Sequence, residues 1–66
     1  MNDTVKETAA RILNYVQSNK SVTAWQIKTH LRLKSSLLYL SLGVLVCEGK
    51  IKLEESGTDY TLSTSL

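Results

Sequence analysis

A chain of 66 residues is about half the size of a typical domain, so we expect one domain over residues 1–66. Hydrophobic residues make up 42% of the chain and charged residues 21%, with a net charge of +2, which excludes an intrinsically disordered protein. The absence of proline and the presence of only three glycines favour helices over a turn-rich all-β fold.

The first predicted element is a helix over residues 4–19. Thr4 and Glu7 have the spacing of a capping box, in which each side chain satisfies a free backbone donor. Asn19 is expected to take the left-handed conformation that ends the helix. Apolar residues recur at helical spacing along one face, at Val5, Ala9, Ile12, Leu13 and Val16.

Two shorter helices are predicted over residues 24–31 and 35–48. Thr23 and Gln26 form a second capping box in front of the first of them. A tight turn, Arg32-Leu33-Lys34, separates the two helices, and Ser35 or Ser36 is expected to cap the second. Gly49 stands where a glycine commonly ends a helix.

A two-stranded hairpin is predicted to follow, over residues 50–54 and 59–63. After Gly49 the period of the apolar residues changes from about 3.6 to 2, which is typical of strands. The intervening loop contains Gly57 and has the length of a hairpin connection. Residues 21–23 are too short for an independent strand, although they could add one pairing to a sheet edge.

This order of elements resembles the winged helix-turn-helix fold. The segment that carries the resemblance most strongly is residues 38–51, LYLSLGVLVCEGKI, with its mid-helix Leu-Gly pair and its Glu-Gly-Lys-Ile ending. It is similar to a family of small, stand-alone winged helix-turn-helix proteins of bacteria and archaea without an assigned function. The resemblance implies an α+β fold, three helices with a C-terminal two-stranded β-hairpin wing, and it implies DNA binding only by analogy.

The predicted core follows from the periodicity. Leu38, Leu42 and Leu45 lie near one line on the third helix, with Ser41 beside them. Trp25 is expected to be partly buried at the start of the second helix. The residues that should pack against this line are Val5, Ile12, Leu13, Val16, Ile27, Leu31, Ile51, Leu53, Tyr60 and Leu62.

The remaining surface of the third helix is also apolar. A helix that reads DNA needs Arg, Lys, Asn or Gln on its outer face, whereas only Ser36 and Tyr39 are polar there. The alternative to an interface is a few scattered exposed apolar residues. A second apolar stripe predicts an interface with a second copy or with another protein. It consists of Leu37, Leu40, Val44 and Cys47.

Positive charge is concentrated in the middle of the chain. Residues 20–52 carry a net charge of +5 and residues 53–66 a net charge of −3. The basic segment indicates an anionic partner such as a phosphate backbone, or else a solvated surface. The acidic hairpin tip, with Glu54, Glu55 and Asp59, would repel phosphates. The predicted nucleic-acid contacts are Lys28, Arg32, Lys34, Ser35, Ser36, Tyr39, Lys50 and Lys52.

The sequence offers little chemistry for catalysis. Cys47 is the only cysteine and His30 the only histidine, so neither a disulfide, a cysteine-based zinc site nor a catalytic triad is expected. We therefore expect no enzyme, no cofactor, no metal and no small-molecule substrate. No uninterrupted apolar run of about 18 residues and no signal peptide is visible, which predicts a cytoplasmic protein without a membrane partner.

Two functions stay open. The first is a nucleic-acid-binding, transcription-regulator-like protein with weak or backbone-dominated DNA contact. The alternative is a protein-interaction module or homodimer that uses the apolar outer face of the third helix and binds no DNA.

Overall fold

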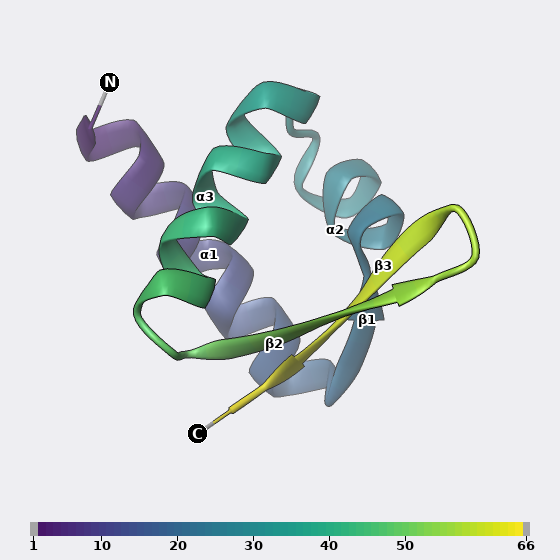
Figure 1. The fold of residues 1–66 in the computed structure, drawn as a ribbon. Helices are drawn as coiled ribbons and strands as arrows, with labels where there is room; N and C mark the ends of the chain where they lie inside the picture. The colour runs from purple at the N-terminus through teal and green to yellow at the C-terminus, as the bar shows by residue number, and fades with distance from the viewer. Residues whose placement is uncertain (1, 66) are drawn as a thin grey trace.

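The computed structural model describes residues 2–65 and shows an α+β arrangement of three helices and a three-stranded antiparallel sheet (Figure 1). The predicted α+β class is confirmed at this level. The sheet has three strands rather than two, because residues 21–23 pair with the last strand at three positions. In chain order the elements are α1 Asn2–Asn19, β1 Ser21–Thr23, α2 Ala24–Leu31, α3 Ser35–Cys47, β2 Ile51–Ser56 and β3 Asp59–Thr64.

The strand order β1-β3-β2 places the C-terminal strand in the centre of the sheet and β2 at an edge. One row of apolar side chains crosses all three strands, because Leu62 on β3 pairs with Val22 on one side and with Leu53 on the other. In Figure 1 the β2–β3 hairpin projects past the end of α3 toward α2. The hairpin therefore adds surface beyond the helical core.

The helix ends follow the predicted chemistry only in part. Thr23 caps α2 as a capping box: its Oγ1 accepts from the Gln26 N–H over 3.1 Å, and Gln26 Oε1 accepts from the Thr23 N–H over 2.8 Å. The predicted cap at Thr4 is wrong, because α1 begins two residues earlier, at Asn2. A difference of that size is common at the frayed end of a helix.

Two further predicted caps are displaced by one residue. Asn19 stays helical and its Nδ2 donates to the Tyr15 carbonyl over 2.8 Å, while Lys20 takes the left-handed conformation with φ 65°. The N-cap of α3 is Lys34 rather than Ser35, and its side chain makes no capping hydrogen bond. The serines therefore occupy the first turn of α3, where the backbone N–H groups lack a side-chain acceptor from the cap.

Residues in the left-handed conformation end α2 and α3. Arg32, with φ 54°, ends α2, and the N–H of Leu33 donates to the Lys28 carbonyl over 2.9 Å. Gly49, with φ 71°, follows α3, and the N–H groups of Gly49 and Lys50 donate to Val46 and Leu45 over 3.0 Å each. This pair of bonds is the Schellman motif, so the expected role of Gly49 is confirmed.

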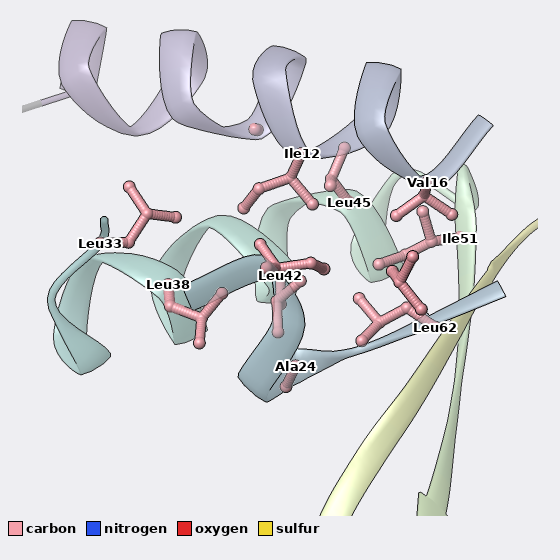
Figure 2. Close-up of a cluster of buried hydrophobic side chains, with 12 residues drawn as sticks. Ile12, Val16, Ala24, Leu33, Leu38, Leu42, Leu45, Ile51 and Leu62 are labelled. Atoms are coloured by element: carbon pink, nitrogen blue, oxygen red, sulfur yellow. The ribbon is translucent and has the colours of Figure 1, made fainter. Parts of the chain in front are cut away.

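The core lies where α1, α3, α2 and the sheet meet (Figure 2). Leu38, Leu42 and Leu45 of α3 are buried, as the periodicity predicts, with Ser41 beside them. Leu13, Leu31 and Tyr60 are partly buried against this cluster, and Val5 is half-buried. The full cluster contains Ala9, Ile12, Val16, Val22, Ala24, Ile27, Leu33, Leu38, Leu42, Leu45, Ile51 and Leu62.

The burial of Leu33 and the exposure of Leu53 both differ from the prediction. Leu33 is buried although it lies in a turn, since an apolar residue that follows a left-handed helix end commonly packs back onto the helix. Leu53 was placed in the core by its alternation but is 40% exposed. Ile51, on the same strand and the same side of the sheet, is buried, so the exposure of Leu53 reflects its position further along the hairpin, which projects beyond the helical core.

Candidate functional site

The outward side of α3 carries exposed apolar side chains. Tyr39, Leu40 and Val46 are among the largest exposed hydrophobic residues, and Cys47 is exposed beside them. The helix contains no charged residue between Ser35 and Cys47. Exposed apolar patches on a small protein are candidates for an interaction surface.

A hollow between α3 and the hairpin organises these residues. It has a volume of about 650 Å³. The rings of Tyr39 and Tyr60 meet edge to face at one part of its wall, with centroids 6.4 Å apart and an interplanar angle of 78°. The lining residues are Tyr39, Leu42, Gly43, Val46, Cys47, Leu53 and Tyr60. We call this the α3–hairpin hollow.

The predicted stripe of apolar residues on α3 divides between two environments. Leu37 packs against the core, and Val44 is half-buried and lines a smaller hollow against α1. Leu40, 54% exposed, and Cys47 remain on the surface. The four residues therefore do not form one continuous exposed face.

Sequence reasoning missed Val46 and misplaced Leu53, both of which line the α3–hairpin hollow. The signal for Val46 was present, because Tyr39, Gly43 and Val46 stand at helical positions i, i+4 and i+7 and so share one side of α3. Nothing in the sequence shows which part of the hairpin extends beyond the helices, so the exposure of Leu53 could not be anticipated.

A second hollow, of about 390 Å³, brings together part of the predicted nucleic-acid surface. Lys28, Ser35 and Tyr39 line it, together with Trp25 and Asp59. The other members of the basic cluster lie at the α2–α3 turn: Arg32, Lys34 and Ser36 are exposed there.

The remaining two predicted contacts lie elsewhere. Lys50 Nζ is 3.4 Å from Glu48 Oε1, and Lys50 lines the small hollow against α1 rather than the hollow that contains Lys28. Lys52 is exposed on β2. The predicted set of phosphate contacts is thus split, and one of its charges already has an acidic neighbour.

Asp59 has a structural role that its place in the acidic tip did not reveal. Its Oδ2 accepts from the Trp25 N–H over 3.2 Å, and its Oδ1 accepts from the Tyr60 N–H over 2.8 Å. The carboxylate thereby satisfies a free donor in the first turn of α2 and faces the positive end of that helix. This bond ties the hairpin tip to α2.

Trp25 is 65% exposed, so its predicted partial burial is wrong. The residue follows Ala24, which fills the inward position of the first turn of α2. The indole is left on the surface at the rim of the hollow that contains Lys28.

The described residues gather no cluster of ionisable side chains for metal binding. No group of three or more His, Cys, Asp or Glu within this part of the chain could hold a metal ion. The ring of His30 stacks on that of Tyr15, with centroids 4.5 Å apart and an interplanar angle of 20°. Within residues 2–65, none of the helices combines the length and the hydropathy that a bilayer-spanning segment needs.

Comparison of the chain with protein-family models, with curated proteins and with solved structures finds no match.

Proposed function

We propose that this chain is a cytoplasmic winged helix-turn-helix protein that acts as a protein-interaction module through the α3–hairpin hollow. The order α1-β1-α2-α3-β2-β3, with a projecting hairpin after α3, supports the winged helix assignment. The observation that carries the function is the exposed apolar wall of the hollow, formed by Tyr39, Val46 and Leu53.

The composition of α3 favours a protein over DNA at this surface. Reading bases in the major groove requires side chains with several hydrogen-bond donors or acceptors. The helix offers Tyr39 at an exposed position and otherwise leucine, valine, serine, glycine and cysteine. Aromatic and aliphatic side chains around a concave surface are instead typical of the centre of protein interfaces.

Selection of random peptides on the immobilised protein tests the proposal. We expect apolar peptides to be enriched, and their binding to be lost in Val46→Asp, because that carboxylate would be buried without a partner. Asn14→Asp, on the exposed side of α1, adds the same charge away from the hollow and is the matched control. Circular dichroism is used to check that both variants are folded. Peptides that bind Val46→Asp with unchanged affinity would contradict the proposal.

A second candidate function is backbone-dominated nucleic-acid binding, which the shared hollow of Lys28, Ser35 and Tyr39 favours. Three to five phosphate contacts would give a slope of log K against log salt of about −3 to −4.5. Titration with random duplex DNA at several salt concentrations measures that slope. Combined replacement of Lys28, Arg32 and Lys34 by alanine should abolish binding, whereas sequence-selective binding that survives the replacement would exclude this surface.

A further inference from the structure

We propose that the partner of the interaction surface is a second copy of this chain, joined by antiparallel pairing of two β2 strands with Leu53 at the two-fold axis. The inference rests on the proposed function, because Leu53 lines the α3–hairpin hollow and also lies at the centre of the paired edge.

The outer edge of β2 is free to pair. Within residues 2–65, β2 is an edge strand of the sheet and pairs with β3 alone. The N–H of Ser65 donates to the Lys50 carbonyl over 3.0 Å, which identifies 50–65 as a hydrogen-bonded pair of the ladder. Because such pairs alternate along an antiparallel ladder, the backbone groups of Ile51, Leu53 and Glu55 face away from β3.

These three residues are symmetric about Leu53, which is what a two-fold axis requires. With Leu53 opposite Leu53 of the second copy, each exchanges two backbone hydrogen bonds with the other. Ile51 then lies opposite Glu55 of the second copy. Six outward-facing N–H and C=O groups on each strand edge would find partners in this one register.

The charges on β2 select this register over its neighbours. Centred on Leu53, the pairing places Lys52 opposite Glu54 of the second copy, at a position where the two side chains are close. Centred on Ile51, it would place Lys50 opposite Lys52, and centred on Glu55 it would place two Glu55 side chains opposite each other. Only the Leu53-centred register joins opposite charges and avoids like ones.

Edge strands are usually protected from self-pairing by charges, often several of one sign. On β2 the exposed charges at Lys52 and Glu54 are of opposite sign. In an antiparallel pair centred on Leu53, Lys52 of one copy therefore lies opposite Glu54 of the other. Leu53 adds an apolar side chain, 40% exposed, on the same side of the sheet as the buried Leu62. The edge therefore favours a second copy rather than repelling it.

The interface is small, with one six-residue edge and one apolar hollow from each copy. An interface below the standard size gives a transient complex, so we expect a dissociation constant on the order of 100 µM. Sedimentation equilibrium from 10 µM to 2 mM covers this range.

Charge exchange on β2 tests the register. Lys52→Glu and Glu54→Lys each place like charges opposite one another in a homodimer, so each variant alone should associate about ten-fold more weakly than the wild type. An equimolar mixture of the two variants, and the double variant K52E/E54K, restore opposite charges at both positions. Both should associate within about three-fold of the wild type. Lys6→Glu, on the exposed side of α1, is the control for a change of net charge.

Hydrogen exchange provides an independent reading. The amides of Leu53 and Glu55 should gain protection as the protein concentration rises, while those of Lys52 and Glu54, bonded to β3, should be protected at all concentrations. A protein that is monomeric at 2 mM overturns the dimer, and so does a dimer whose association is unchanged in Lys52→Glu. Apolar peptides that still bind the hollow in that case leave the proposed function standing, whereas loss of both refutes both.

Discussion

Replacing Gly43 and Gly49 with alanine should shift stability in opposite directions. Gly43 lies in the middle of α3 on its exposed side, and a Cβ added there would meet nothing within 4 Å. Glycine within a helix costs about 0.5–1 kcal/mol relative to alanine, so Gly43→Ala should stabilise the protein by about that amount. At Gly49 a Cβ also meets open space, but φ is +71°, and the left-handed conformation costs an alanine about 1–2 kcal/mol.

Thermal unfolding followed by circular dichroism separates the two cases. For a domain of this size a change of about 1 kcal/mol shifts Tm by about 4–8 °C. We expect Tm to rise in Gly43→Ala and to fall in Gly49→Ala. Measurement at 10 µM keeps the protein well below its expected dissociation constant, so that the wild type and the variant are compared as monomers. A fall in Tm of Gly43→Ala at this concentration would show that the glycine is needed within the monomer and would refute the reasoning.

Two further substitutions test the packing and the link between hairpin and helix. Leu45→Ala removes a buried side chain and should cost about 2–5 kcal/mol in urea denaturation, whereas the exposed Leu40→Ala should cost less than about 0.5 kcal/mol. A larger cost for Leu40→Ala than for Leu45→Ala would mean that the faces of α3 are assigned the wrong way round. Asp59→Ala removes the acceptor for the Trp25 N–H and should lower the free energy of unfolding by about 0.5–2 kcal/mol, as loss of a helix cap does. Glu55→Ala is the control. An equal effect of the two substitutions would exclude a capping role for Asp59.

The local features of the fold could be predicted because each depends on a few neighbouring residues. Thr23 and Gln26 form the expected capping box, and Gly49 ends α3 in the expected conformation. The change of period after Gly49 located the hairpin. Two caps are displaced by one residue: Lys20 and Lys34 take the positions for which the neighbouring Asn19 and Ser35 are the preferred residue types, so composition alone could not place them.

The features that could not be predicted depend on contacts between distant parts of the chain. Trp25 and Asp59 are 34 residues apart, and no local sequence pattern predicts a hydrogen bond between them. Val22 and Leu53 pair with Leu62 from the two edge strands, yet Val22 is buried and Leu53 is 40% exposed, because the helices cover one part of the sheet and leave the projecting part of the hairpin uncovered. The α3–hairpin hollow was missed for the same reason, since it exists only once the hairpin is positioned against α3.

The net charge of a segment says less about function than the place of each charge. The hairpin was interpreted as acidic and therefore as unsuited to DNA. Yet the carboxylate of Asp59 is engaged by backbone donors at the start of α2, and that of Glu48 lies beside Lys50. Lys52 and Glu54 are separated by one residue, so in an antiparallel pair of β2 strands centred on Leu53 each lies opposite the other in the second copy. The acidic charge that distinguishes this hairpin from a phosphate-binding one is thus what a self-pairing strand needs, and the charge-exchange variants of β2 test that assignment directly.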